Sequence, residues 1–590
     1  MAKMKRRSAG PRSAAGRVTL WAIGIAALCF ATSPVHAESG RDPHEGWNFK
    51  FKDFVIAAWS PPATTDAEYR LYKDAGFNVV MTPRNQFPDE ALALAEKYGL
   101  AVMIDTYTPH GRPWGGVEGD YFPHPAHHPA TFPELKWLVE RYGDHPALAG
   151  ILLGDDIGPL PPQLVKNTRW MREHAPHLIP WVCQCIYSPE SLAEHGNPIY
   201  NPQFYPTLFA ADLPAWEQAE LYCSLLDSLR ESAGQHNLTP WPFFNVSAIE
   251  RGELFESDSL LRFQVYASLA YGAQGIWYFT YRGCGSLFDG KEVCAACGSS
   301  EEASAYIEPN WFAAKEVNHR VAAWGPELLG RKAAKVYHSG PWPAPPAEDA
   351  VVRTDKTLFF NWELGPPVPA MPADDFEVTW TGYIRSKSFD EVTFTTVSND
   401  GVRLWVDGKK IIDNWTDHFA VEDTGKIQLP LAKMVPIRVE YYEKDSLAAL
   451  ILYWSSPTLP REIVPSDCLF TDTDGGETGL RGEYRALPSR LWRNSLRPGR
   501  DELVVKMSND LLVGILTKPG EAPLAMVVDK RVDTRFRALD HRTVKVRFAD
   551  AVQSLTMLDE HGGQRIDGHT IRLTLPAGGG QLLRLDTKAI

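Results

Sequence analysis

The sequence predicts a multidomain protein in which a (β/α)₈ TIM barrel is followed by two all-β sandwich domains. From residue 54 to about residue 330, strand-like and helix-like stretches alternate in eight repeats, which is typical of a parallel sheet. The proline-rich stretch 341–346 (P-W-P-A-P-P) then marks a boundary. Beyond it, short strands alternate with Gly, Asp and Asn turns, as in β-sandwiches.

The barrel, predicted over 44–340, is built from short apolar strands, each followed by a stretch with helical spacing. Thr64-Thr65 is a predicted helix N-cap and Gly99 a predicted helix stop. The expected strands are 54–59, 78–82, 100–107, 149–158, 178–187, 201–205, 241–246 and 275–281. The main expected helices are 64–72, 88–98, 132–142, 162–174, 214–232, 257–271 and a last one ending near residue 330.

Two sandwich domains are predicted after the barrel, over 351–470 and 485–590. Residues 471–478 (T-D-T-D-G-G-E-T) read as a flexible join between them. In the last domain the expected strands are 511–516, 524–528, 543–548 and 571–575, and no residue there indicates chemistry.

Residues 1–37 have the pattern of a signal peptide. A basic start precedes the uncharged apolar segment 18–32, and Val35-His36-Ala37 fits a cleavage site. An uncleaved anchor is the alternative. We therefore expect an exported protein, periplasmic, cell-surface or extracellular, with no membrane span after signal removal, because no other stretch is long and apolar enough.

The charge balance argues against a nucleic-acid partner. Removal of residues 1–37 takes away six Lys and Arg and no Asp or Glu, which changes the net charge from −13 to −19. A chain this acidic repels phosphate backbones. The 11% aromatic content, with 19 Trp, fits a protein that stacks rings on sugar faces, although large cores also use these residues.

The first candidate for chemistry is the stretch 149–158 (A-G-I-L-L-G-D-D-I-G). Its apolar run stops at Asp155 and Asp156, which would lie at the carboxyl end of the fourth strand, where barrels keep their active sites. Asp156 is the predicted catalytic acid, with a helix N-cap as the alternative. Asp155 is a predicted substrate contact or structural acid, because neighbouring strand residues point to opposite sides.

Other polar and aromatic residues at predicted strand ends could hydrogen-bond or stack on a sugar. Trp59, together with Trp277, could form a stacking floor, or both could be core residues. The predicted substrate-binding residues are Trp59, Arg84, Tyr107, Asp155, Tyr205, Asn245, Tyr278 and Arg282.

Residues 351–470 alternate apolar and polar positions and use Asp-Gly pairs at hairpin turns. Their motifs include Phe359-Phe360-Asn361-Trp362, Val378-Thr379-Trp380-Thr381-Gly382, Ser398-Asn399-Asp400-Gly401 and Ile412-Asp413-Asn414-Trp415. On these motifs the segment resembles the anthrax-protective-antigen-type (PA) domain, a lectin-like β-sandwich. Sugar-binding members hold Ca²⁺ with two adjacent Asp residues, so the resemblance implies calcium ligands at Asn399 and Asp400. A spacer sandwich without ligand is the alternative.

This family usually opens with a strand of the form Gly-Leu-x-Gly-Glu-Tyr, which here lies after the domain, at 479–484. We expect a permuted arrangement in which this segment supplies an edge strand. A linker repeat without a structural role is the alternative.

The barrel resembles clan A glycoside hydrolases, near the β-galactosidase-like and cellulase-like members. The residues that carry this resemblance are Gly154-Asp155-Asp156, Phe204-Tyr205-Pro206 and Ala270–Ile276. The family places an acid/base Glu after strand four and a nucleophilic Glu after strand seven. Here strand four ends in Asp156, and strand seven ends Phe243-Phe244-Asn245-Val246-Ser247 with no carboxylate. Glu250, Asp105 and Asp155 are the candidates for the second carboxylate that glycoside cleavage requires.

The sequence thus predicts an exported glycosidase that acts on a poly- or oligosaccharide and needs no cofactor for catalysis. The rival hypothesis is a glycan-binding protein whose barrel has lost its nucleophile. The empty position after strand seven favours the rival, whereas the acid pair and the polar strand ends favour the enzyme.

Overall fold

The computed structural model describes most of the chain after residue 41. The described residues are 42–83, 87–106, 132–157, 159–184, 188–204, 215–246, 257–282, 287–289, 306–307, 309–340, 350–363, 366–369, 371–372, 374–418, 420–444, 448–487, 496–533, 541–560 and 562–587. Within these residues, no helix combines the length and the apolar character needed to cross a membrane.

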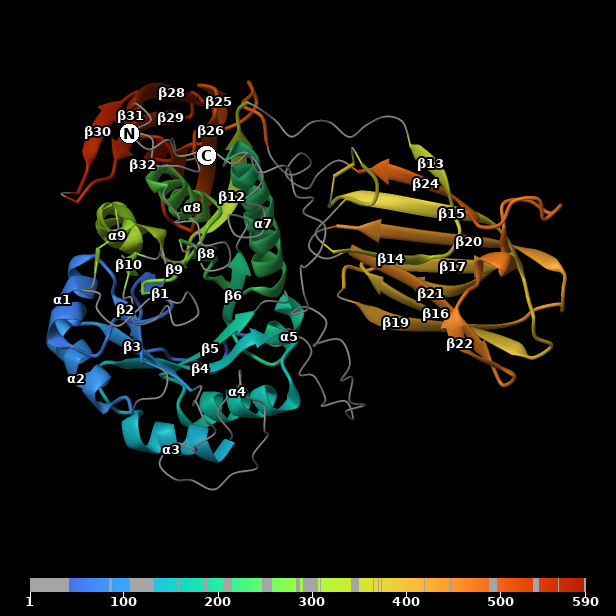
Figure 1. Ribbon diagram of the computed structural model, residues 1–590. Coiled ribbons are helices and arrows are strands. Elements are labelled where there is room, and N and C mark those ends of the chain that lie inside the picture. The colour runs from blue at the N-terminus through green and yellow to red at the C-terminus, as the bar shows by residue number, and fades with distance from the viewer. Residues whose placement is uncertain are drawn as a thin grey trace, which may run out of the picture.

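The first domain is a closed barrel of eight parallel strands surrounded by helices, as the sequence predicts (Figure 1). The barrel strands are β1 (Val55–Ala58), β2 (Val79–Met81), β3 (Ala101–Asp105), β4 (Leu148–Ile157), β5 (Ile179–Gln184), β6 (Ile199–Phe204), β8 (Phe243–Asn245) and β9 (Gly275–Phe279), with the short β7 (Thr239–Pro240) beside β6. The helices are α1 (Asp66–Asp74), α2 (Asp89–Tyr98), α3 (Phe132–Tyr142), α4 (Pro162–His174), α5 (Pro189–Glu194), α7 (Ala215–His236), α8 (Asp258–Ala270) and α9 (Pro309–Leu328). A small hairpin of β10 (Phe288–Asp289) and β11 (Tyr306–Ile307) precedes α9.

Local signals in the sequence set several helix ends. The Thr65 side chain accepts a hydrogen bond from the Glu68 backbone N–H at 3.3 Å, so it is the N-cap of α1. Gly99 ends α2 with a φ of 61°, a left-handed conformation that suits glycine. Ser257 caps α8 by accepting from the Leu260 N–H.

The barrel strands are buried on both faces. One set of side chains packs inside the barrel and includes Val55, Ala57, Met103, Trp181 and Trp277. The alternate positions pack outward against the helices, which accounts for the continuous apolar runs in the sequence.

The last domain is a sandwich of two sheets. One sheet has the strand order β12-β26-β27-β32-β29-β30 and the other has the order β25-β28-β31. Its strands are β12 (Lys332–His338), β25 (Val504–Met507), β26 (Leu511–Thr517), β27 (Leu524–Asp529), β28 (Arg542–Phe548), β29 (Val552–Met557), β30 (Gln564–Asp567), β31 (Thr570–Leu575) and β32 (Gly580–Thr587). The sequence assigned 332–338 to the barrel domain, but β12 pairs antiparallel with β26 along its length. Its apolar residues fill the edge of the sandwich instead.

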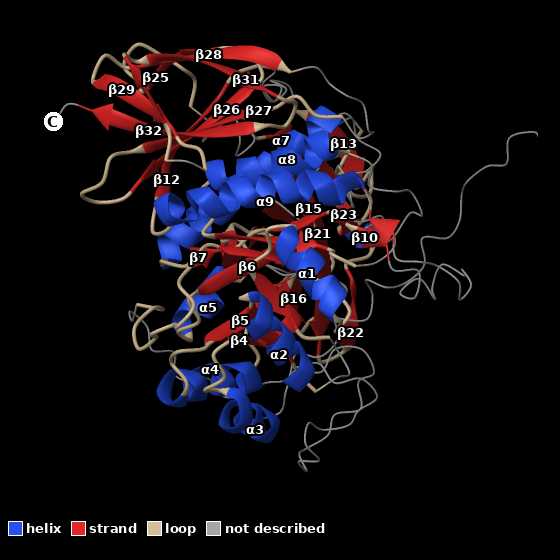
Figure 2. Ribbon diagram, turned by 90° about the vertical axis from the view of Figure 1, so that its left-hand side faces the viewer, coloured by secondary structure: helices blue, strands red, loops and turns tan. Residues whose placement is uncertain are grey.

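The sandwich packs directly on the helical layer of the barrel (Figures 1 and 2). Leu512, Met526 and Leu582 belong to the same buried cluster as Phe263 of α8 and Trp324 of α9. Polar groups are also held at this contact. The His338 imidazole lies 3.0 Å from the Tyr271 hydroxyl, and burial lowers its pKa well below the ordinary value. Barrel and sandwich therefore share one continuous core.

The middle domain is a separate sandwich, at the right of Figure 1. One sheet has the order β13-β24-β15-β20-β17-β18, with β23 beside β15, and the other has β14-β21-β16-β19, with β22 beside β21. The strands are β13 (Val351–Asp355), β14 (Phe359–Glu363), β15 (Phe376–Arg385), β16 (Glu391–Asn399), β17 (Val402–Val406), β18 (Lys409–Asn414), β19 (Val421–Gln428), β20 (Met434–Glu443), β21 (Ala448–Ser456), β22 (Leu459–Ile463), β23 (Leu469–Phe470) and β24 (Leu480–Ala486).

The strand β24 returns to this middle domain after the segment that the sequence treated as its end. It pairs with β13 on one side and with β15 on the other, so it is an internal strand and not an edge strand. Its Tyr484 hydroxyl donates to Asp355 Oδ2 at 2.6 Å, and the Trp380 indole N–H donates to the same oxygen at 2.7 Å. These buried bonds make 479–486 part of the domain core.

Candidate active site

The carboxyl ends of the barrel strands bring two buried aspartates to the interior. On β3, Met103 faces the interior cluster and Ile104 faces the helices, so by alternation Asp105 faces inward. Its side chain is 2% exposed, and its backbone N–H donates to Thr82 Oγ1 at 2.9 Å. Asp105 is therefore held at the top of β3 and points toward the barrel axis.

A bulge in β4 determines which way Asp155 faces. Leu152 packs inside the barrel and Leu153 packs on the helices, and the pairing with β5 shifts around Gly154. A Cβ added at Gly154 would lie 2.6 Å from Leu164 Cδ1 of α4, so Gly154 also faces the helices. The alternation then turns Asp155 inward, where it is 6% exposed. The sequence predicted Asp155 as a substrate contact or a structural acid and could not decide between them, because it does not show this extra residue.

The strand β8 ends in a carboxamide. Phe243 packs against Trp277 inside the barrel, and Phe244 packs against Tyr278 in the helical layer. Asn245 follows with its side chain inward and 1% exposed, and its backbone carbonyl accepts from Gln264 Nε2 at 3.1 Å.

An aromatic cluster fills the barrel below these polar groups. Trp181 and Trp277 stack with ring centroids 4.1 Å apart, and the ring centroids of Phe243 and Trp59 are 5.9 Å apart. Trp59 and Phe279 are partly exposed, whereas Trp277 is fully buried. Of the predicted stacking floor, Trp59 therefore lies at the surface of the cluster and Trp277 lies in its core.

Tyr278 points away from the barrel interior. Its hydroxyl donates to Asn318 Oδ1 of α9 at 2.7 Å, in the helical layer outside the barrel, so the structure does not bring it together with Asp105, Asp155 and Asn245. The Arg282 guanidinium, which follows β9, lies 3.8 Å from Glu68 Oε1 of α1, and its contact with substrate stays a prediction.

The remaining predicted site residues lie outside the described part of the chain. They are Arg84, Tyr107, Tyr205 and Glu250, together with the side chain of Asp156, whose backbone ends β4.

Two interior side chains, Gln203 and Phe279, were not predicted from the sequence. Gln203 on β6 donates through Nε2 to the Cys183 thiol at 3.1 Å, and Phe279 lies 6.0 Å from Phe243. Phe279 lies within a predicted strand. It differs from Tyr278 in the face of the strand to which its side chain points, and the sequence does not show which face is inside the barrel. Gln203 was discoverable as a polar residue within a strand that is otherwise buried.

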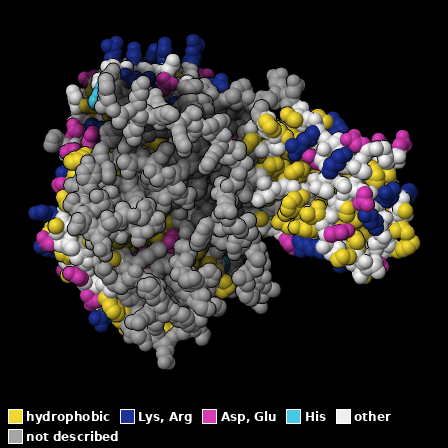
Figure 3. Space-filling view, viewed as in Figure 1, with side chains coloured by type: hydrophobic (Ala, Val, Ile, Leu, Met, Phe, Trp, Pro, Cys, Tyr) yellow, Lys and Arg dark blue, Asp and Glu magenta, His cyan; other side chains and the backbone are white. Residues whose placement is uncertain are grey.

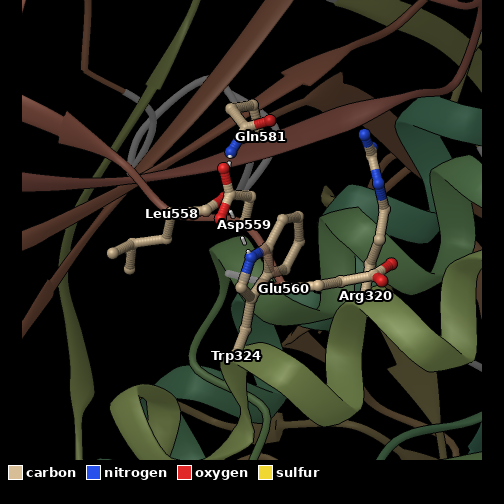
Figure 4. A pocket seen from close by; sticks show the side chains of 6 residues that line it. All are labelled: Arg320, Trp324, Leu558, Asp559, Glu560 and Gln581. Carbon is tan, nitrogen blue, oxygen red and sulfur yellow. Dashed lines mark hydrogen bonds between the residues drawn. The ribbon is translucent and has the colours of Figure 1, made fainter. Parts of the chain in front are cut away.

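A cavity of about 300 Å³ lies between α9 and the C-terminal sandwich (Figure 4). The Trp324 indole N–H and the Gln581 amide both donate to the Leu558 carbonyl at its wall. The next residue on α9, Gly325, lies against Phe54 at the amino end of β1. The cavity is therefore at the opposite end of the barrel from the candidate active site. Its lining residues are Arg320, Trp324, Leu558, Asp559, Glu560 and Gln581.

The middle domain carries the predicted calcium ligands. Asp400 accepts hydrogen bonds from the backbone N–H of His418 and of Lys444, one on each carboxylate oxygen and both at 2.9 Å. The Asn399 carbonyl accepts from the Tyr441 hydroxyl. Among the described residues, no group of three or more His, Cys, Asp and Glu side chains is arranged to hold a metal ion. A Ca²⁺ ion takes six to eight oxygens, and both carboxylate oxygens of Asp400 already accept a backbone hydrogen bond.

Calcium binding at Asn399 and Asp400 stays a prediction, and the contacts predict its strength. Calcium would have to compete with two backbone hydrogen bonds, so we expect stabilisation only at about millimolar Ca²⁺. A calcium titration followed by the Tm of the full chain measures this, with Mg²⁺ as the control for ionic strength. A rise in Tm at about 10 µM Ca²⁺ would contradict it.

The face of the middle domain seen in Figure 3 mixes hydrophobic and charged side chains. Three guanidinium groups lie over aromatic rings, with distances to the ring centroid of 3.9 Å for Arg438 over Trp405, 4.3 Å for Arg403 over Trp415 and 4.4 Å for Arg461 over Tyr453. Such pairs hold the rings in fixed orientations.

Residues 337–467 match the family model of the PA14 domain. Two curated proteins match this region. Anti-sigma-I factor RsgI3 of Acetivibrio thermocellus is 38% identical over 138 residues, which cover 22% of this chain and 21% of that protein. Protective antigen of Bacillus anthracis is 28% identical over 93 residues, which cover 15% of this chain and 11% of that protein. The chain thus spans about a fifth or less of the length of these relatives.

Solved structures are similar over two different parts of the chain. A GH42 β-galactosidase from G. stearothermophilus covers 91% of this chain and 99% of its own, at 10% sequence identity and a TM-score of 0.46. A PA14 sugar-binding domain from an RTX adhesin covers 22% of this chain and 91% of its own, at 13% identity and a TM-score of 0.17.

Proposed function

We propose that the protein is an exported glycoside hydrolase that acts on a poly- or oligosaccharide. The observation that carries this proposal is the pair of buried, inward-facing carboxylates, Asp105 and Asp155, in a barrel that also holds the partly exposed ring of Trp59. Carboxylates and a ring at the carboxyl ends of barrel strands are what glycoside cleavage requires.

In this proposal Asp156 protonates the leaving glycosidic oxygen. Asp105, Asp155 and Glu250 are the candidates for the second carboxylate, which assists at the anomeric carbon. Trp59 and Asn245 would also contact the sugar, and Arg84, Tyr107 and Tyr205 are further proposed contacts. No step requires a cofactor.

The PA14 domain would hold the polysaccharide near the barrel and raise its effective concentration at the site. The signal-peptide pattern of residues 1–37 supports export to the compartment where such polymers lie.

A second candidate function is glycan binding without cleavage. Asn245 favours it, because a carboxamide stands inside the barrel at the end of β8, where the resemblance to clan A enzymes implies a nucleophile.

The test is glycan hydrolysis by the full mature chain across a broad panel of polysaccharides. Product formation is expected, with a fall of about 10²–10⁴-fold in kcat for Asp156→Asn, because the variant cannot donate a proton. Asp550→Asn, an 81% exposed acid of the last domain, is the matched control and should keep full activity. Glycan binding without any product would favour the binding function instead.

A further inference from the structure

We propose that the barrel cleaves glycosides of 2-acetamido-2-deoxy sugars and uses the acetamido group of the substrate as its nucleophile. This inference rests on the proposed hydrolase function and names its substrate class. It assigns to Asp155 the task of holding the acetamido N–H.

The described carboxylates at the site stand on one wall of the barrel. The strands β3 and β4 are neighbours, with Asp105 paired to Leu152, so Asp105 and Asp155 rise from adjacent strands. In the order β5-β4-β3-β2-β1-β9-β8, three strands separate β3 from β8, so Asn245 stands on the opposite wall. Acids face an amide across the barrel.

Within the described residues, Asp105 and Asp155 do not flank a substrate from opposite walls. In the two-carboxylate mechanism one group protonates the leaving oxygen, and the other attacks the anomeric carbon, or activates water, from the opposite face of the sugar. Among the described residues, the wall opposite Asp105 offers the carboxamide of Asn245, which carries no charge and is a poor nucleophile. A nucleophile carried by the substrate removes this requirement, and such substrate-assisted glycosidases form a known exception to the two-carboxylate rule.

Adjacent acids on one wall suit the substrate-assisted reaction. The acetamido carbonyl oxygen attacks C1 and forms a C1–O bond, while the bond from C1 to the leaving oxygen breaks. The leaving oxygen receives the proton of the catalytic acid, which the proposed function assigns to Asp156. The product is an oxazolinium ion, whose N–H hydrogen-bonds to the Asp155 carboxylate. Water then attacks C1 while the C1–O bond of the oxazolinium breaks and its electron pair returns to the acetamide oxygen. The carboxylate of the former acid takes one proton from this water, and the neutral acetamide is restored. Both steps need a negative charge beside the nitrogen, and Asp155 is the buried carboxylate that the β4 bulge turns inward.

The aromatic cluster suits the methyl group of the acetamide. The rings of Trp59 and Phe279 are partly exposed above the buried Trp181 and Trp277, and Phe243 lies within 6.0 Å of both upper rings. A methyl group placed on this surface buries apolar area, which a 2-hydroxyl group cannot do. The same surface therefore favours the 2-acetamido sugar over its 2-hydroxy counterpart.

The first experiment compares matched substrates on the full mature chain. Aryl N-acetyl-β-glucosaminides and N-acetyl-β-galactosaminides are assayed beside the aryl β-glucoside and β-galactoside. We expect kcat/KM to be at least about 100-fold higher for the 2-acetamido member of one pair. With that member, replacing N-acetyl by N-trifluoroacetyl should lower kcat about 10-fold or more, because the fluorines weaken the attacking carbonyl oxygen.

Asp155→Asn tests the assigned role. It should lower kcat on the acetamido substrate about 10²-fold or more, because an amide cannot balance the positive charge of the oxazolinium. The loss should shrink on the trifluoroacetyl substrate, where attack by the carbonyl oxygen contributes less. A purely structural role for Asp155 would lower both rates equally, and that result would overturn the assignment.

A second readout examines the protein for a nucleophile of its own. Incubation with 2-deoxy-2-fluoro aryl glycosides followed by intact-protein mass spectrometry should show no covalent sugar adduct. An adduct, or a 2-hydroxy glycoside cleaved as fast as its acetamido partner, would overturn this inference while leaving the hydrolase function standing. If no glycoside of any kind is cleaved, the proposed hydrolase function fails and this inference fails with it.

Discussion

Asp529→Ala is expected to lower the free energy of unfolding by about 3–5 kcal/mol. The Asp529 carboxylate is completely buried at the end of β27 in the C-terminal sandwich. It accepts hydrogen bonds from Arg531 at 2.8 and 3.0 Å and from Arg542 at 2.7 and 3.0 Å. Removal of the carboxylate leaves two partly buried guanidinium groups without this counter-charge, and that desolvation is no longer offset.

A matched control separates burial from the presence of an ion pair. Asp550 lies 3.4 Å from Arg547 in the same domain, but its side chain is 81% exposed. Asp550→Ala should therefore change stability by no more than about 1 kcal/mol. Urea unfolding of the full chain measures both variants, and equal losses would show that burial does not set the strength of the Asp529 cluster.

Gly514→Ala is expected to destabilise the protein by about 3 kcal/mol. Gly514 lies in β26 where the sandwich meets α8, and an added Cβ would lie 2.0 Å from the Ala270 carbonyl oxygen. The obstacle is helix backbone, which cannot rotate away as a side chain can. Either β26 or the end of α8 must then move, and the shared core between the barrel and the sandwich opens.

Gly234→Ala is the same chemical change in open space. Gly234 lies in α7, and an added Cβ would meet no atom within 4 Å. Alanine is the better helix former, so stability should rise by about 1 kcal/mol. Calorimetry should therefore show the two substitutions shifting Tm in opposite directions, and a Gly514→Ala protein as stable as the parent would contradict the close packing at α8.

Much of the fold was predictable because it depends on local chemistry. Short apolar runs predicted the barrel strands, and stretches with apolar residues at helical spacing predicted the helices. The predicted helix 132–142 has the same first and last residues as α3. The capping role of Thr65 and the stop at Gly99 are properties of single residues and their immediate neighbours. Strands of the last domain such as β26 and β31 were also predictable, since clear turns bound them.

Pairings between distant segments were less accessible. Lys332–His338 reads as an ordinary strand, and nothing local shows that its partner is β26, nearly 180 residues later. The strand β24 was recognised by its motif, but its place between β13 and β15 depends on both neighbours. The sequence indicates which residues form strands. Which strands pair depends on the strand edges whose hydrogen-bonding groups are still unpaired in the folded domain.

The sequence by itself determined that two acids end β4 and that no carboxylate ends β8, because these are matters of residue identity. Only the tertiary structure decided that Asp155 faces the barrel interior. Gly154 has no side chain, so it fits against Leu164 of α4 and adds one residue to the strand. That bulge reverses the alternation and turns Asp155 inward. The residue types of a strand do not reveal where it contains a bulge. The position of the extra residue depends on the helix that packs behind the strand.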